Sequence, residues 1–287
     1  MTNLSNLHGR LLEYLIVEEI LKINSSAKLT RRAFESQNRD FLKLEAIDRS
    51  LLQKLRLAAK SVSQGWLDPR FGISTRKSLE IDRLPDSNNH SDVTDIRLSL
   101  GLEILNLSIK HNHTALRHQR PRKTPVHCGY AQNSNEMRTF SREYRAITSQ
   151  FTQQVRGYKL FRDLPESWVY DFLYSPVCDL VCEFININSE ECAMKLFQYL
   201  VGAINYYKVI IRTQNEEIEI QEFGKTEYPK KVKASVSRQY IYLDFSNDWK
   251  IRMRLHTASS RIESSPSLKF DTGAISISVP TLLIPYD

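Results

Sequence analysis

The sequence predicts an α/β fold in which helices flank a mixed β-sheet and the C-terminal half is rich in strands. Three patterns support this fold class. Two stretches near the N-terminus repeat apolar residues at helical spacing, and residues 74 to 110 contain segments that alternate apolar and polar side chains. The final third holds further alternating segments at short spacing. With 287 residues and 41% hydrophobic content, the chain can bury its own core as one large domain or two smaller ones.

Two amphipathic helices are predicted first. One covers residues 6 to 23 and the other residues 45 to 63, and both are expected to cover one face of the sheet. The apolar stripe of the first consists of Leu7, Leu11 and Leu15, with Leu12, Ile16, Ile20 and Ile23 beside it. The apolar stripe of the second consists of Ile47, Leu51, Leu55, Ala58 and Val62.

The stretch from Ser74 to Lys110 is predicted to supply the strands of the sheet. The segments TDIRLSL and LEILNLSIK are expected to pair as a hairpin through a turn at Gly101. Asp95 and Lys110 then lie near each other at one end of the hairpin. Alternation in the second segment puts Glu103, Leu105, Leu107 and Ile109 on one face, and Ile104, Asn106, Ser108 and Lys110 on the other.

A carboxylate beside a lysine suits metal-assisted hydrolysis of a phosphodiester. The carboxylate of Asp95 can hold a hard cation, and the ammonium group of Lys110 can position the attacking water or help to deprotonate it. The alternative interpretation is structural: Lys110 is a solvated strand end, and Asp92 and Asp95 are ordinary turn residues in SNNHSDVTD.

Beyond the hairpin, Pro121 and Pro125 break the chain into a loop. Residues 136 to 163 and 189 to 204 are then predicted to be mostly helical. KVIIRTQNEEIEIQEF is predicted to form a hairpin about Gln214 and Asn215, and SRQYIYLDF, WKIRMRLHTAS and LKFDTGAISISV to form further strands. Arg252, Arg254 and His256 alternate on one strand face. They are candidates for contacts to guanine, or alternatively they keep an edge strand soluble.

A basic stretch follows the first hairpin. Five Lys and Arg side chains and no Asp or Glu occur from Ile104 to Asn135. Such a run is either a solvated face or the path of a DNA backbone, to which Lys and Arg supply most non-specific affinity. The net charge of +7 and the pI of about 9.1 suit a polyanion partner. The candidate DNA-binding residues are His111, Asn112, His113, Arg117, His118, Arg120, Arg252, Arg254, His256 and Lys269.

The order Asp95, strand, Lys110 resembles the PD-(D/E)xK nuclease core. The strings DVTDIRL and LSIKHNHTALRHQR are more specifically similar to HaeIII-type type II restriction endonucleases, as are GRLLEYLI, YLVGAINYYKVI and RMRLHTASSRIESSPSLKFD. The resemblance therefore touches most of the chain. It implies a PD-(D/E)xK-like core and an Mg²⁺-dependent enzyme that cuts double-stranded DNA at a short palindrome, GGCC for the type member.

One position departs from the family pattern. Ser108 stands two residues before the lysine, where the motif has an acid, and serine is a poor ligand for Mg²⁺. Since Mg²⁺ needs only one or two protein carboxylates, Asp95 is expected to ligate it with a second acid. Candidates for that acid are Glu13, Asp92 and Asp86; the resemblance favours Glu13, because related nucleases often carry a glutamate on the N-terminal helix.

Two alternative functions remain open on the sequence alone. One is a sequence-specific DNA-binding or repair protein whose nuclease site has degenerated, with Ser108 as the sign. The other is a structure-specific repair nuclease on the same core.

Residues 1 to 130 are predicted to form the nuclease core with the catalytic hairpin and the basic loop. Residues 131 to 287 are predicted to form a helical and then strand-rich part that recognises DNA.

The four cysteines form no CxxC pair and are expected to serve packing in a reducing compartment. No apolar run reaches the roughly 18 residues of a membrane span, so a cytoplasmic protein is expected. A homodimer is a further candidate partner.

Overall fold

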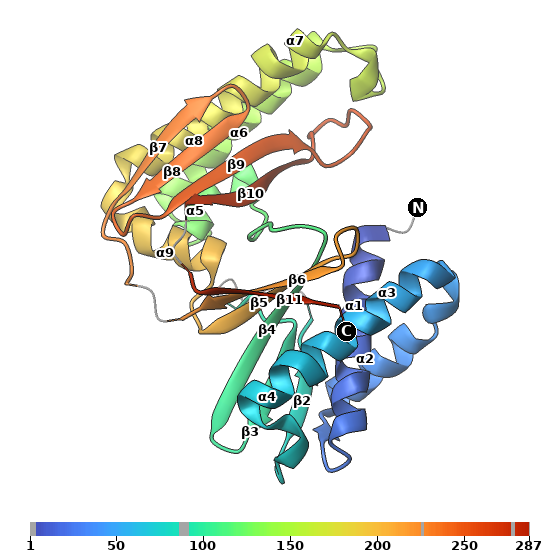
Figure 1. The fold of residues 1–287 in the computed structure, drawn as a ribbon. Coiled ribbons are helices and arrows are strands. Elements are labelled where there is room, and N and C mark those ends of the chain that lie inside the picture. The colour runs from blue at the N-terminus through green and yellow to red at the C-terminus, as the bar shows by residue number, and fades with distance from the viewer. Residues whose placement is uncertain (1–3, 86–91, 225–226, 277–278, 287) are drawn as a thin grey trace. The chain divides into compact units, whose positions relative to one another are not determined.

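The computed structural model describes residues 4–85, 92–224, 227–276 and 279–286, and shows two compact units (Figure 1). The first unit comprises Met1–Thr114, Ile204–Thr226 and Val279–Asp287, and the second comprises Ala115–Ala203 and Glu227–Ser278. The chain thus leaves the first unit after residue 114 and returns to it twice, whereas the sequence predicted a single boundary after residue 130.

A mixed sheet organises the described part of the first unit, with seven strands in the order β1-β2-β3-β4-β5-β6-β11. The β1–β2 and β4–β5 pairs are parallel and the others antiparallel. Both local and distant segments of the chain therefore build one sheet. The strands are β1 (Lys28–Leu29), β2 (Glu80–Arg83), β3 (Ile96–Leu100), β4 (Glu103–His111), β5 (Tyr206–Arg212), β6 (Glu217–Phe223) and β11 (Thr281–Pro285).

Helices cover one face of this sheet, as predicted. The helix predicted over residues 6 to 23 is α1 (Leu4–Ile23), and its Leu12, Leu15 and Ile16 share a buried core with Leu107 of β4. The second predicted helix starts at α3 (Arg49–Lys60) and continues through the π-helical η2 (Ser61–Leu67) into α4 (Asp68–Phe71). The remaining elements are α2 (Arg31–Phe41), η1 (Leu44–Ala46) and η3 (Ile73–Thr75).

Helix α2 has no counterpart in the sequence prediction. Thr30 caps its N-terminus by accepting a hydrogen bond from the Ala33 amide. Its buried residues are Ala33, Gln37 and Asp40, so two of the three side chains that face inward are polar. An apolar stripe at helical spacing, on which the prediction of the other helices rests, is therefore missing from this segment.

The second unit contains a four-stranded antiparallel sheet in the order β10-β9-β8-β7 within the described residues. Helix α8 packs on β7 and β8, and α9 packs on β7. The strands are β7 (Val232–Ser237), β8 (Tyr240–Phe245), β9 (Lys250–Thr257) and β10 (Leu268–Ser276). The helices are η4 (Pro121–Lys123), α5 (Thr124–His127), α6 (Asn135–Gln154), η5 (Phe161–Asp163), α7 (Glu166–Val169), η6 (Tyr170–Tyr174), α8 (Ser175–Ile187) and α9 (Ser189–Val201).

Several sequence predictions are corrected in this half of the chain. The helix expected over residues 136 to 163 ends at Gln154, and the helical run from α7 to α8 was not predicted. The hairpin of β5 and β6 forms about residues 213 to 216 as expected. It belongs to the first unit, however, because β5 pairs in parallel with β4 across a long crossover that local periodicity cannot reveal.

Two further sequence expectations concern cysteines and membranes. Cys128, Cys178 and Cys192 are buried thiols, which agrees with the expected packing role. Within the described part of the chain, no helix has both the length and the apolar composition that crossing a bilayer requires.

Candidate active site

The β3–β4 hairpin brings Asp95 next to Lys110, as predicted. Leu100 pairs with Glu103 across a two-residue turn in which Gly101 has a φ of 73°, a value that favours glycine. Asp95 directly precedes β3. Its amide donates to the Leu107 carbonyl (2.8 Å) and its carbonyl accepts from the Leu84 amide (2.9 Å), so two neighbouring chain segments fix its backbone.

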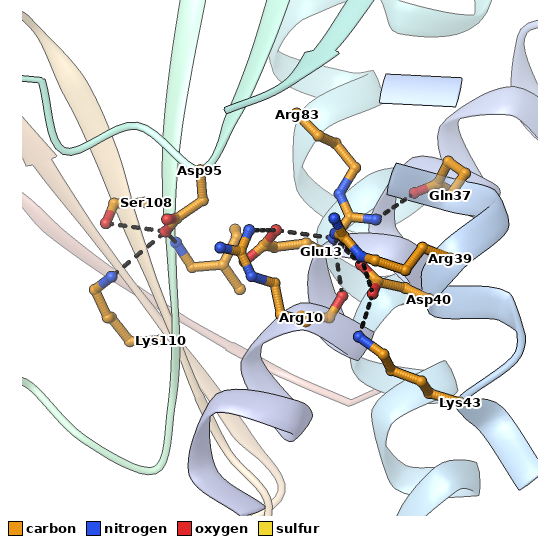
Figure 2. A network of polar contacts seen from close by, with 11 residues as sticks. Arg10, Glu13, Gln37, Arg39, Asp40, Lys43, Arg83, Asp95, Ser108 and Lys110 are labelled. Atoms are coloured by element: carbon orange, nitrogen blue, oxygen red, sulfur yellow. Dashed lines mark hydrogen bonds and ion pairs between the residues drawn. The ribbon is translucent and has the colours of Figure 1, made fainter. Parts of the chain in front are cut away.

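Three donors converge on one oxygen of the Asp95 carboxylate (Figure 2). Its Oδ2 accepts from the Ile109 amide at 2.7 Å, and lies 3.4 Å from both the Ser108 hydroxyl and the Lys110 Nζ. The side chains of Asp95 and Lys110 are 18% and 25% exposed. The pair is therefore held in place by the strand and still accessible to a substrate.

Glu13 of α1 is the second acid near Asp95. Its Oε2 accepts from Arg83 Nη2 at 2.9 Å and from Arg10 Nη1 at 3.3 Å. Burial and the negative charge of Asp95 together raise the pKa of Glu13 to about 7, against the lowering effect of Arg83 and Arg10. The two carboxylates thus repel each other, so a cation between them would be stabilising.

The carboxylates of Asp95 and Glu13 fit a divalent cation that needs few protein ligands. Among the described residues there is no group of three or more His, Cys, Asp or Glu side chains that could hold a metal ion. Mg²⁺ keeps several waters and is commonly held by one or two carboxylates. Asp95 and Glu13 could supply these two, whereas Ser108 donates to Asp95 and adds no charge.

The other candidate acids are placed differently. Asp92 accepts from Arg97 Nη2 at 2.7 Å and from the Thr94 amide at 3.0 Å, a local turn contact of the kind foreseen by the structural interpretation. Its charge is therefore neutralised by Arg97 and not by Lys110. Asp86 lies outside the described residues.

Arg83 connects Glu13 to a buried network that sequence reasoning missed (Figure 2). Its side chain is 1% exposed, and it contacts Asp40 Oδ2 at 2.8 Å and the Gln37 Oε1 at 2.9 Å in addition to Glu13. Although burial acts to raise the pKa of Asp40, hydrogen bonds from Arg39 and Lys43 and the charge of Arg83 hold it at about 2. No sequence signal marks Arg83, which ends an ordinary alternating strand.

A second lysine on the same sheet face was also missed. Lys208 of β5 pairs in register with Ser108 of β4, is buried, and donates to the Thr114 carbonyl. Burial and the charge of Lys110 lower its pKa to about 7. Only the parallel pairing of β4 with β5 brings it near the candidate site.

Two of the predicted DNA contacts, His111 and Asn112, lie in the first unit and make contacts within the protein. His111 is buried, and its ring lies 5.1 Å from that of His8, centroid to centroid. Burial and the neighbouring His8 lower its pKa to about 4. Asn112 has a φ of 57° and exchanges hydrogen bonds with the Thr213 amide and hydroxyl, which ties the ends of β4 and β5 together. His113 beside it is exposed.

The remaining predicted DNA contacts lie in the second unit. His118, His256 and Lys269 all approach the Asp271 carboxylate, at 3.3, 2.9 and 3.8 Å. Arg120 is exposed and donates to the Ser267 hydroxyl at 3.0 Å.

Arginines of this group also stack on tyrosines. The Arg117 guanidinium lies over the Tyr199 ring at 5.0 Å, and that of Arg252 over the Tyr240 ring at 5.5 Å. Arg252 and Arg254 are exposed on β9, whereas Ile251 and Met253, which alternate with them along the strand, are buried, so the predicted alternation is confirmed.

Comparison with known proteins gives three matches. The model of the HaeIII restriction endonuclease family matches residues 9–227. The type II restriction enzyme HaeIII of Haemophilus aegyptius is 23% identical over 96% of this chain and 96% of its own length. An uncharacterized protein of Acanthamoeba polyphaga mimivirus is 20% identical over 85% of each chain. The family match includes Asp95, Lys110 and Glu13 and stops before β7.

Proposed function

The chain belongs to the HaeIII restriction endonuclease family, and on that premise we propose that it hydrolyses double-stranded DNA at a short palindrome with the help of Mg²⁺. It is a restriction endonuclease, a site-specific deoxyribonuclease, as the family match and the HaeIII relative support. The palindrome proposed first is GGCC, which the family resemblance implies.

The contact between Asp95 and Lys110 at the end of the hairpin is the observation that carries this proposal. Asp95 and Glu13 would hold the Mg²⁺, which neutralises charge that develops on the phosphate. Lys110, 25% exposed, would donate a hydrogen bond to the attacking water and orient it toward phosphorus. The backbone contacts of Asp95 would keep the carboxylate in place during this chemistry.

Recognition of the palindrome is assigned in this proposal to the exposed face of the second unit's sheet. Arg252 and Arg254 project from that face, and an arginine that contacts O6 and N7 of guanine discriminates a G·C pair. A two-fold symmetric site suits a homodimer, one copy for each half-site. The free, mostly buried cysteines suit the reducing cytoplasm, where a restriction enzyme would meet DNA.

Digestion of unmethylated plasmid DNA tests the proposal. The wild-type protein with Mg²⁺ should give discrete fragments, and sequencing the fragment ends should show one shared palindrome. Omission of Mg²⁺ should abolish cutting. Retention of plasmid without cutting would instead support the alternative of a DNA-binding protein with a degenerate site, for which Ser108 is the supporting observation. Ends that share a palindrome other than GGCC would correct only the recognition sequence.

A further inference from the structure

Four arginines line one groove of the second unit. Arg138, Arg142 and Arg145 come from α6, and Arg122 comes from η4; Gln132, Met137 and Ser141 complete the lining. The groove has a volume of about 560 Å³. Since residues three and four apart share a helix face, the three arginines of α6 form a single row.

The positive charge of this groove is not neutralised within the protein. Among the residues that the structure describes, none of the four arginines forms an ion pair with a carboxylate. The acids of α6 are on another face, where Glu136 and Glu143 line a separate groove. Helix α6 therefore separates its charges, with acids on one side and arginines on the other.

Hydrogen-bond donors remain available in the groove. Arg138 donates from Nε and Nη2 to the Asn133 carbonyl, at 3.1 and 2.6 Å, which fixes its guanidinium at the start of α6. A guanidinium has five N–H donors, so others can reach a ligand. Four like charges gathered in a concave surface repel each other, and an anion relieves that repulsion.

We propose that this arginine groove, formed by Arg122, Arg138, Arg142 and Arg145, binds the phosphodiester backbone of DNA without reading its sequence. This inference rests on the proposed function, because it takes DNA as the partner. Arginine forms bidentate hydrogen bonds to phosphate oxygens, and the row along α6 offers them in series, as a chain of phosphates requires. Gln132 and Ser141 add neutral donors and no negative charge.

The test compares DNA binding by the wild type and by the double variant Arg142→Gln/Arg145→Gln, with Ca²⁺ in place of Mg²⁺ so that DNA is held but not cut. Binding to cognate and scrambled duplexes is measured at several salt concentrations. The plot of log affinity against log salt concentration has a negative slope, and in the variant this slope should become shallower by roughly one to two units. Both duplexes should lose affinity by the same factor, on the order of tenfold near 0.1 M salt.

A matched control removes two positive charges elsewhere in the same unit. Arg156→Gln/Lys159→Gln changes the net charge equally, and neither residue lines the groove. An equal loss of slope in this control would show that net charge and not the groove is responsible, and would overturn the proposal. An unchanged slope in the groove variant, whose fold is verified by circular dichroism, would also overturn it.

Tripolyphosphate distinguishes an extended backbone from a small polyphosphate ligand. At matched ionic strength and free Ca²⁺ concentration, it should displace DNA from the wild type only at concentrations far above those at which a competing duplex does, because a duplex offers a longer series of phosphates. Strong displacement that the groove variant abolishes would identify a compact polyphosphate site and overturn the proposal. Failure of the proposed function can be distinguished from failure of the groove proposal. A wild-type protein that binds DNA through the groove but never cuts it would refute only the nuclease assignment.

Discussion

Asp95 occupies the position on which the proposed chemistry depends. Its Oδ2 receives the Ile109 amide, the Ser108 hydroxyl and the Lys110 ammonium, and its Oδ1 receives none of these three. A carboxylate with one oxygen held by the protein is restricted in rotation while the other can face a cation. Ser108 helps to orient Asp95, and this contact explains why position 108 holds a polar side chain.

Substitution of either member of the pair should stop cutting. Asp95→Ala and Lys110→Ala should each reduce the single-turnover rate on the order of a hundredfold or more, because charge stabilisation at the phosphate is lost. Ser108→Ala is the control on the same strand and should retain most activity. Digestion at a near wild-type rate by Lys110→Ala would refute its assigned role.

Glu13 makes both stability and Mg²⁺ affinity depend on pH. Its pKa is about 7 in the folded protein, against 4.5 for a free side chain, so between these values the folded state keeps a proton that the unfolded state has released. The stabilising contribution is fully present below pH 4.5 and disappears as pH rises to about 7. The free energy of unfolding, measured with a denaturant, should therefore decrease in the wild type relative to Glu13→Gln as the pH rises from 4.5 to about 7. Addition of Mg²⁺ should reverse this decrease.

The same variant tests the metal role of Glu13. A protonated carboxyl is a poor ligand, so the Mg²⁺ concentration for half-maximal rate should fall as pH rises through about 7 in the wild type. Glu13→Gln should need more Mg²⁺ and show a weaker pH dependence. An identical Mg²⁺ titration for the variant would instead favour Asp92 as the second acid.

At the scale of elements, one buried arginine joins two helices to the sheet. Arg83 ends β2 and contacts Glu13 and the Arg10 carbonyl of α1 as well as Gln37 and Asp40 of α2. This network holds the N-terminal helix, and with it Glu13, at a fixed place relative to β2. The two polar side chains on the inward face of α2 are explained by the same contacts.

Removal of the Asp40 charge should destabilise the protein strongly. Asp40→Asn leaves Arg83 buried with less compensation, a change that costs about 3 to 5 kcal/mol in comparable pairs. The free energy of unfolding measured by urea titration at pH 7 tests this. Glu35→Gln on the same helix is the control: it breaks an exposed pair with Arg31 and should cost less than about 0.5 kcal/mol. Equal effects of the two changes would contradict the network's role.

Strand β9 tests recognition separately from the arginine groove. If Arg252 or Arg254 contacts guanine, changing it to Gln should weaken binding to cognate DNA by about 1 to 3 kcal/mol. Binding to scrambled DNA should be nearly unaffected. The salt slope should change less than in the groove variant. Lys250→Gln, exposed on the same strand face, is the matched control. Equal losses for cognate and scrambled duplexes would assign these arginines to phosphates.

At the scale of the whole molecule, each compact unit is built from segments that are separated in the sequence. The first unit takes its sheet from three separate segments, and β11 near the C-terminus pairs with β6. The family match over residues 9–227 includes β1 to β6, whereas β7 to β10 of the second unit follow it. The candidate catalytic residues are thus within the matched segment, and Arg252 and Arg254 are beyond it.

The sequence by itself determined the local parts of this protein. The turn at Gly101 and strict alternation place Asp95 beside Lys110, helical spacing identifies α1, and alternation puts Arg252 and Arg254 on one face of β9. Each of these features depends on residues close together in the chain. Side-chain periodicity within a helix or hairpin is enough to predict them.

The tertiary structure alone decided the contacts between distant segments. It brings Lys208 opposite Ser108, places Arg83 between Glu13 and Asp40, and buries His111 against His8. The parallel β4–β5 pair closes a crossover that spans residues 112 to 205, and the buried side of α2 is mostly polar. Such pairings depend on the collective burial of many residues and on charges that are neutralised only after folding, so no local pattern in the sequence encodes them.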